Sequence, residues 1–172
     1  MGVPSYFKNI IQTYPDILIS KDNFHYKVNN LFFDLNCLIH PCCRGLTDEQ
    51  EMYEKIYNGI LEIIDICKPK DLVYIAIDGV CPRSKIEQQR KRRFKSALEK
   101  KSWDTNAITP GTKFMNSLSI FLNRINFSEY NFDVIVSDSS YEGEGEHKIL
   151  QYMKKHFKNL KKNENNENNE NN

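Results

Sequence analysis

The chain has 172 residues, with 24 Lys and Arg against 23 Asp and Glu, and a formal net charge of +1. This length suits one domain of modest size with its own core. The balanced charge excludes a strongly basic or acidic chain, so only local clusters of charge inform on partners. No run of 18 apolar residues is present, and the first ten residues, MGVPSYFKNI, lack the apolar core of a signal peptide. We therefore expect no membrane partner and no secretion.

Three apolar segments predict strands, at 30–35 (NLFFDL), 71–78 (DLVYIAID) and 131–138 (NFDVIVSD). Their nearly continuous hydrophobicity is typical of strands that are buried on both faces of a parallel sheet. Each segment carries an aspartate at or near its end, namely Asp34, Asp78 and Asp138. Because ligands bind at the carboxyl ends of parallel strands, these acids are expected at the functional edge of the sheet.

Helical patterns lie between the predicted strands. The segment 47–67 opens with Thr47 and Gln50 in capping-box spacing, and the segment 109–125 opens with Thr109 and Pro110 as an N-cap and first residue. Further helices are expected in the basic segment after Pro82 and after the glutamate-rich stretch at 141–146. Strands that alternate with helices predict an α/β fold with a mostly parallel central sheet and flanking helices.

The cysteines are five in number, an odd count without the spacing of a disulfide framework: Cys37, Cys42, Cys43, Cys67 and Cys81. Reduced thiols predict a cytoplasmic protein, with the nucleus as the alternative. A zinc site made by Cys37, His40, Cys42 and Cys43 is the less favoured interpretation. Adjacent cysteines fit one tetrahedral site poorly, and no C-x-x-C pair is present.

The stretch YEGEGEHKIL (141–150) places three glutamates beside two glycines. Two carboxylates about 4 Å apart repel by roughly 4 kcal/mol at an effective dielectric near 20. A divalent ion would relieve that repulsion, and all-oxygen ligation favours Mg²⁺ or Mn²⁺. The predicted ligands are Asp34, Asp78, Glu144 and Glu146. Taken singly, each acid also fits a helix cap or a solvated turn, which is how we interpret Asp138 and Glu142.

The segment CPRSKIEQQRKRRFKSALEK (81–100) is the strongest local cluster of charge. A helix from about Lys85 would place Lys85, Gln89, Arg92 and Arg93 on one face, without an opposing carboxylate. Such a face suits a terminal phosphate, because Arg binds its oxygens bidentately. Ile86, Phe94 and Ala97 are expected to face inward. A solvated basic helix or a non-specific nucleic-acid patch stays open as the alternative.

Five motifs occur in order along the chain: MGVPSYF, FFDLNCLIH, AIDGVCPRSKIEQQRKRRF, WDTNAITPGTKFM and SDSSYEGEGEHKIL. Together they resemble the N-terminal conserved region of the Xrn family of 5′→3′ exoribonucleases, over nearly all of residues 1–157. The resemblance implies a PIN- or flap-nuclease-like fold and metal-dependent hydrolysis. The substrate it implies is single-stranded RNA with a 5′-monophosphate, with Mg²⁺ or Mn²⁺ as cofactor.

The resemblance also assigns roles to residues. Asp34, Asp78, Glu144 and Glu146 match the catalytic metal-site acids of the family, and His40 matches a catalytic-site histidine that stacks near the terminal nucleotide. The 5′-phosphate pocket corresponds to Lys85, Gln89, Arg92 and Arg93. Gly2 would contact the substrate close to the active site.

This chain departs from the family pattern in two ways. The region between Phe94 and Trp103 looks shorter, and the family's further metal-binding aspartates have no counterpart before the tail at 158–172. We expect that Asn/Glu/Lys-rich tail to be disordered. Four interpretations stay open: an active enzyme, a truncated product, one half of a split nuclease completed by a separate chain, and a binder of 5′-phosphorylated RNA. A flap-type DNA nuclease is the least favoured alternative.

Overall fold

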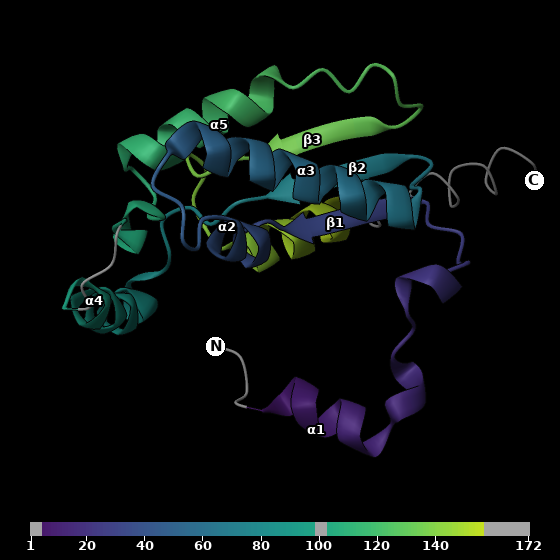
Figure 1. The fold of residues 1–172 in the computed structure, drawn as a ribbon, viewed down its shortest axis with the longest axis horizontal. Helices are drawn as coiled ribbons and strands as arrows, with labels where there is room; N and C mark the ends of the chain where they lie inside the picture. Colours follow the sequence, from purple (N-terminus) through teal and green to yellow (C-terminus); the bar gives the residue numbers. More distant parts are fainter. Residues whose placement is uncertain (1–4, 99–102, 157–172) are drawn as a thin grey trace, which may run out of the picture.

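The computed structural model describes residues 5–98 and 103–156, and its centre is a three-stranded parallel sheet (Figure 1). The strands are β1 (Asn30–Asp34), β2 (Leu72–Ala76) and β3 (Asp133–Ser137), in the order β1-β2-β3. In this register Ala76 pairs with Asp34 on one side and with Ser137 on the other. The predicted α/β fold with a parallel sheet and flanking helices is confirmed, and each strand lies inside its predicted segment.

The central strand β2 is buried along its whole length, which explains its continuous apolar sequence. Successive side chains of a strand point to opposite faces. Val73 and Ile75 therefore join the main core, whereas Leu72, Tyr74 and Ala76 join a smaller cluster on the other face. That smaller cluster includes Ile149 and Tyr152 from the helical residues 145–156. The sheet thus lies between two layers of helix.

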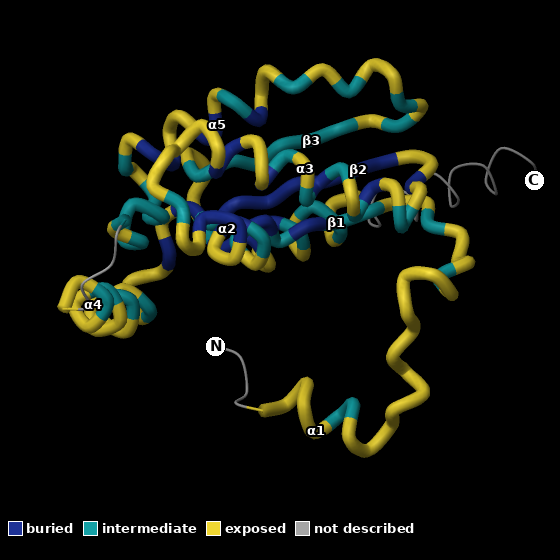
Figure 2. The backbone as a smooth tube through the Cα atoms, viewed as in Figure 1, coloured by how far each residue is buried: buried dark blue, intermediate teal, exposed yellow. Residues whose placement is uncertain are grey.

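The main core is formed by α3 (Glu49–Cys67) and α5 (Lys113–Arg124), which lie on one side of the sheet in Figure 1. The buried positions of α3 repeat every three or four residues: Met52, Tyr53, Ile56, Ile60 and Ile64. Those of α5 are Phe114, Met115, Leu118, Ser119 and Leu122. This spacing gives each helix a single apolar face. Figure 2 shows the resulting buried layer along the strands.

Both predicted helix caps are wrong. The N-cap of α3 is Asp48, whose carboxylate accepts a hydrogen bond of 2.8 Å from the Glu51 amide. Thr112, not Thr109, caps α5 and accepts from the Met115 amide at 3.3 Å. The Pro-Gly pair before it forms a turn in which Gly111 has a φ of 87°. That positive φ is typical of the third residue of a type II turn, so the dipeptide precedes the helix and does not begin it.

The sequence patterns did not predict the short elements. These are α1 (Tyr6–Thr13), η1 (Pro15–Ile17), η2 (Lys21–Asn23), α2 (Asn36–Cys42) and η3 (Thr105–Ala107). We refer to residues 5–26 as the N-terminal arm; none of them is buried. Figures 1 and 2 show α1 apart from the sheet layers, whereas Lys21 of η2 forms an ion pair of 3.5 Å with Glu62 of α3. Its exposed large apolar residues are Tyr6, Phe7, Tyr14, Ile17, Leu18, Ile19 and Tyr26.

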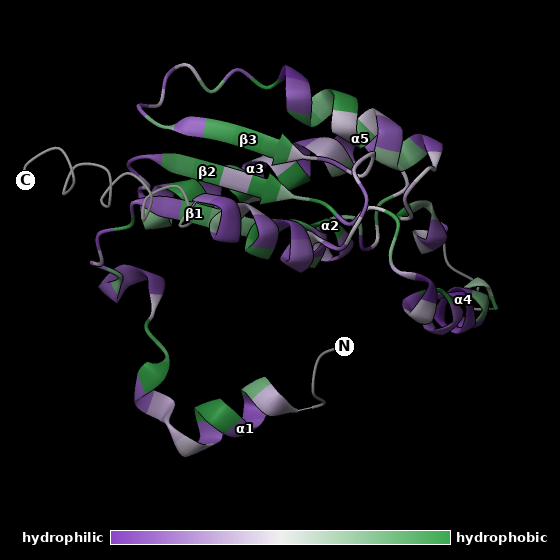
Figure 3. Ribbon diagram, turned by 180° about the vertical axis from the view of Figure 1, so that it is seen from behind, coloured by the Kyte–Doolittle hydropathy of each residue, from purple (hydrophilic) through white to green (hydrophobic). Residues whose placement is uncertain are grey.

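The basic helix α4 (Arg83–Ala97) begins two residues before its predicted start. It has no buried residue and is largely hydrophilic (Figure 3). The prediction that Ile86, Phe94 and Ala97 face inward is wrong, since all three are exposed and Phe94 reaches 70%. Polar contacts hold the helix instead: Ser96 Oγ lies 3.1 Å from Thr105 Oγ1 in η3.

Among the described residues, no helix combines the length and the apolar character that a bilayer crossing requires. Two predictions lie outside the described residues, namely the disordered tail at 158–172 and the placement of Gly2 near the site.

Candidate active site

The structure brings Asp34 and Asp78 together with the first turn of the helix at 145–156. Asp34 ends β1, and Asp78 follows β2 by two residues. The Gly145 amide donates a hydrogen bond of 2.7 Å to Asp78 Oδ1. A Cβ atom on Gly145 would lie only 2.8 Å from Asp34 Oδ1, so a side chain there would collide with that carboxylate. Glycine at 145 thus lets the backbone between two glutamates approach both aspartates.

The four acids of the predicted site act on one another electrostatically. The pKa of Asp34 is raised, first because burial disfavours its charged form and next because Asp78 lies near. Glu146 and Glu144 raise it further, while a hydrogen bond from the Asn36 amide, 3.3 Å long, opposes the shift. A cation among these carboxylates would relieve that repulsion.

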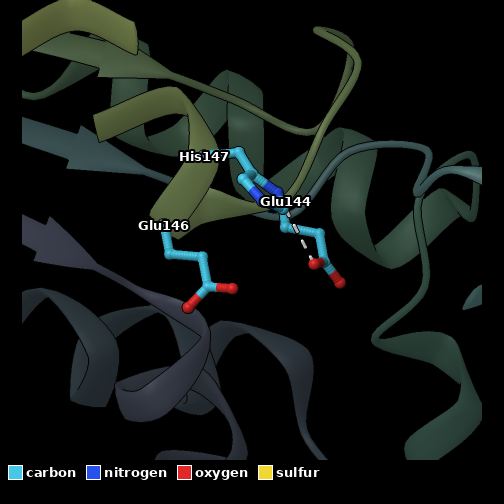
Figure 4. Close-up of side chains that lie close together, drawn as sticks. All are labelled: Glu144, Glu146 and His147. Carbon is cyan, nitrogen blue, oxygen red and sulfur yellow. Dashed lines mark ion pairs between the residues drawn. The ribbon is translucent and has the colours of Figure 1, made fainter. Parts of the chain in front are cut away.

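Within this cluster, Glu144, Glu146 and His147 lie close enough to hold one ion. One ligand atom from each residue lies within 4.8 Å of the others. Figure 4 shows both carboxylates on the same side of the helix start, with the imidazole beside Glu144. His147 Nδ1 lies 3.7 Å from Glu144 Oε2. Oxygen-rich ligation of this kind suits Mg²⁺ or Mn²⁺.

In the part of the chain that the structure describes, this is the only group of three or more acids, histidines or cysteines at that spacing. The alternative zinc set at 37–43 forms no such group. The predicted set of four acids is represented there by Glu144 and Glu146, while Asp34 and Asp78 flank them from the strand ends.

Lys85 joins the basic helix to the acidic cluster. Its ammonium forms an ion pair with Glu144 Oε1, and the two side chains are 28% and 7% exposed. The pKa of Lys85 is raised, chiefly by the hydrogen bond to Glu144. The prediction that no carboxylate opposes the basic face is therefore wrong at this position. The Lys85 ammonium thus supplies one positive charge to the acidic cluster, which agrees with the mutual repulsion of its carboxylates.

The other residues of the basic face lie along α4. Arg93 Nη2 donates to Gln89 Oε1 at 3.0 Å, which orders both side chains. The pKa of His40 is lowered, first by loss of solvation and then by the charge of Arg92, whereas Asp78 opposes the shift. His40 at the end of α2 is thus within electrostatic reach of both the basic helix and the acidic cluster.

Two residues near the site were missed by the sequence analysis, His147 and Lys148. Lys148 is 5% exposed, and its ammonium donates to the carbonyls of Ile77 and Asp138, both at 2.7 Å. Burial lowers the pKa of Lys148. His147 and Lys148 follow Glu144 by three and four residues. On a helix this spacing places the three side chains on one side, so it could have identified both residues.

The two remaining acids of the loop behave as the sequence suggested. Asp138 Oδ1 accepts a hydrogen bond of 2.9 Å from the Ser140 amide, as a turn residue does, and Glu142 is exposed.

Comparison with known proteins supports the resemblance to the Xrn exoribonucleases along almost the whole chain. The family model described as the XRN 5′-3′ exonuclease N-terminus matches residues 1–102 and 97–169. The chain is 34% identical to 5′-3′ exoribonuclease 2 of Gallus gallus over 214 positions, and 32% identical to the protein of that name from Cryptococcus neoformans over 220. It is 36% identical to 5′-3′ exoribonuclease 1 of Schizosaccharomyces pombe over 186 positions.

These alignments cover 90% of the chain but only 23%, 20% and 14% of the three relatives, respectively. The chain thus spans about a fifth of the length of the curated relatives it matches. The alignments are longer than the chain itself, so the relatives carry insertions relative to it. The two matches of the family model meet at residues 97–102, which lie in the segment that looks short in the sequence.

Proposed function

Because the chain belongs to the family of XRN 5′-3′ exonuclease N-termini, we propose that it takes part in metal-dependent 5′→3′ hydrolysis of single-stranded RNA carrying a 5′-monophosphate. The observation that supports this proposal most is the contact between the basic helix and the acidic cluster, made by Lys85 and Glu144. Side chains suited to bind a phosphate, placed beside a carboxylate cluster, suit the removal of a terminal nucleotide.

The proposed ion is Mg²⁺ or Mn²⁺, held by Asp34, Asp78, Glu144 and Glu146. Such an ion lowers the pKa of a bound water and neutralises charge that develops on a phosphodiester. The acids also arrange one another: Asp78 accepts from the Gly145 amide and thereby sets the start of the helix that carries Glu146. His147, beside Glu144, is an additional candidate ligand.

The chain's own cations would bind the substrate end. In this proposal Lys85, Gln89, Arg92 and Arg93 hold the 5′-phosphate, because Arg donates bidentately and Lys adds a compact charge. His40, within electrostatic reach of both Arg92 and Asp78, would stack on the terminal base. A triphosphate end would bring more bulk and negative charge to these four side chains than a monophosphate, and a hydroxyl end would offer them no anion.

The test uses the full chain with Mn²⁺ and three RNAs that differ only at the 5′ end. Faster decay of the monophosphate RNA than of the hydroxyl and triphosphate RNAs is expected, and Asp78→Ala should abolish it. Asp133→Ala is the matched control, because the exposed Asp133 is the first residue of β3, whereas the acidic cluster lies at the carboxyl ends of the strands. Equal decay of all three ends would contradict the proposal, and preference for branched DNA would favour a flap-type nuclease.

A second candidate is a 5′-phosphate RNA-binding module or one half of a split nuclease, completed by a separate chain. The exposed apolar residues of the N-terminal arm favour the split form, because several exposed apolar side chains on one segment are typical of an interaction site. Binding of 5′-phosphorylated RNA without turnover, weakened by Arg92→Ala and by salt, would support this candidate. No measurable binding of 5′-phosphorylated RNA by the parent chain would reject it.

The proposed location is the cytoplasm, with the nucleus as the alternative. The five cysteines, all of them described, are free thiols, as a reducing compartment requires.

A further inference from the structure

Lys148 has no role in the proposed chemistry, yet it is buried beside the acidic cluster. Among the described residues, the buried charged side chains are those of Lys148 and Glu144, one helical turn apart. A buried ammonium is costly unless hydrogen bonds replace its water. Lys148 meets that requirement with two carbonyl oxygens, of Ile77 and Asp138, each at 2.7 Å.

The two carbonyls belong to neighbouring strand ends. Ile77 directly follows β2 and Asp138 directly follows β3. The Ile77 amide also donates to the Ser137 carbonyl at 2.9 Å. A single ammonium group therefore ties the helix at 145–156 to the carboxyl ends of both strands.

The loops beyond these strand ends are in direct contact as well. The Gly79 amide donates to the Gly143 carbonyl at 2.8 Å, and the Gly143 amide donates to the Val80 carbonyl at 2.9 Å. A Cβ atom on Gly79 would lie 1.7 Å from the Tyr141 carbonyl oxygen, so no side chain fits between the loops. Asp78 lies between Ile77, which accepts from Lys148, and Gly79, which is held against the second loop.

We propose that Lys148 is a positioning residue that holds Asp78, Glu144 and Glu146 at the spacing that cation binding requires. It acts through its two hydrogen bonds, which fix the first turn of the helix against the Asp78 loop. The Gly145 amide bonded to Asp78 lies within that turn. Residues that orient metal ligands from behind commonly affect metal affinity tenfold or more. This inference rests on the proposed metal site.

The two possible actions of Lys148 on cation affinity have opposite signs. A positive charge near carboxylates repels an incoming cation, so loss of that charge alone would tighten cation binding. Loss of the two hydrogen bonds would instead release the helix turn and weaken binding. The direction of the change thus separates a positioning role from a simple charge effect.

The test measures Mn²⁺ binding to the full chain by isothermal titration calorimetry, without reference to activity. Lys148→Met keeps a similar length and removes the N–H donors, and it is expected to bind Mn²⁺ at least tenfold more weakly. Lys154→Met, on an exposed position of the same helix, is the control and should stay within twofold of the parent chain. Equal or tighter binding by Lys148→Met would overturn the proposal.

Amide hydrogen exchange provides a second readout that needs no metal. The amides of Gly79 and Gly145 should exchange faster in Lys148→Met, while those of Ile56 and Ile60 in α3 stay protected. If the parent chain binds no Mn²⁺, the proposed metal site is wrong. Hydrogen exchange then tests the positioning role of Lys148 by itself, and unchanged protection of the Gly145 amide in Lys148→Met would overturn that role. If Lys148→Met does not fold, Lys148→Gln replaces it, because its side chain ends one atom short of the lysine ammonium and so disturbs the two hydrogen bonds. Weaker Mn²⁺ binding is then expected, and equal or tighter binding overturns the proposal.

Discussion

The Gly145 amide and the Asp78 carboxylate, 67 positions apart in the sequence, meet in a hydrogen bond of 2.7 Å. One partner begins a helix and the other follows the central strand. This bond therefore joins the two halves of the acidic cluster, the end of the central strand and the start of the helix that carries Glu146.

Replacement of Gly145 by alanine should disturb the cluster. The new methyl group would lie 2.8 Å from Asp34 Oδ1, closer than carbon and oxygen normally approach, so the carboxylate or the helix start must move. We expect Mn²⁺ affinity, measured by calorimetry, to fall at least tenfold. Gln151→Ala, on an exposed position of the same helix, should leave it unchanged. Parent-like affinity in Gly145→Ala would show that the close approach is not required.

Asp34→Asn should stabilise the metal-free chain. The raised pKa of Asp34 means that its contribution to stability is present below its unfolded pKa and is lost as the pH rises through the folded value. At pH 7 the ionised carboxylate therefore costs stability, and asparagine removes this cost. We expect a Tm increase of roughly 2–4 °C in EDTA, equivalent to about 1 kcal/mol.

Added Mn²⁺ should reverse that order, because the parent chain gains a cation that the variant binds poorly. Thermal unfolding with and without Mn²⁺ provides the measurement. A variant that is less stable than the parent in EDTA, or equally stabilised by Mn²⁺, would argue against repulsion at Asp34.

Two ion pairs of the basic helix should differ in their effect on stability. Lys85→Met leaves the nearly buried Glu144 without its lysine partner and should cost about 1–3 kcal/mol in metal-free urea unfolding. Glu87→Gln removes the exposed pair with Arg90, in which both side chains are 71% exposed, and should cost less than about 0.5 kcal/mol. Similar costs for the two variants would mean that Glu144 does not depend on Lys85.

Cys43 should make stability fall at alkaline pH. Burial raises the pKa of its thiol from 9.0 to about 11. Its contribution is thus complete below pH 9 and is lost as the pH rises through 11, by about 2 kcal/mol at that point. Cys43→Ala is expected to be less stable than the parent at pH 8, and the gap should narrow by pH 11. Urea unfolding under reducing conditions measures it, and a constant gap would contradict the burial of Cys43.

The sheet could be predicted from the sequence because burial on both faces leaves a continuous apolar run. β2 is the clearest case, with all five residues buried. The short helix α2 escaped prediction, since it has only seven residues and contains Pro41. The caps were missed because Thr47 and Asp48 are adjacent and both cap helices well, and local spacing does not choose between them.

The candidate site was predictable to the extent that it follows topology. Asp34 and Asp78 lie at strand ends, where the fold brings them together. The ion pair of Lys85 with Glu144 was not predictable, because it joins residues 59 positions apart whose distance depends on how α4 leaves the sheet. Lys148 was missed although it follows Glu144 by one helical turn, because its partners are main-chain carbonyls, which every residue has.

The ion pair of Lys85 gives this residue a different electrostatic role from the exposed cations of α4. A charge that is matched by a neighbour projects little field beyond the pair, and solvent ions screen what remains within about 10 Å. In the proposed function, distant RNA would therefore be attracted by the exposed cations of the helix, such as Lys91, Arg92 and Lys95, while Lys85 would act only on contact. Capture of RNA from solution and recognition of its 5′ end would then respond differently to ionic strength, although one helix supplies both.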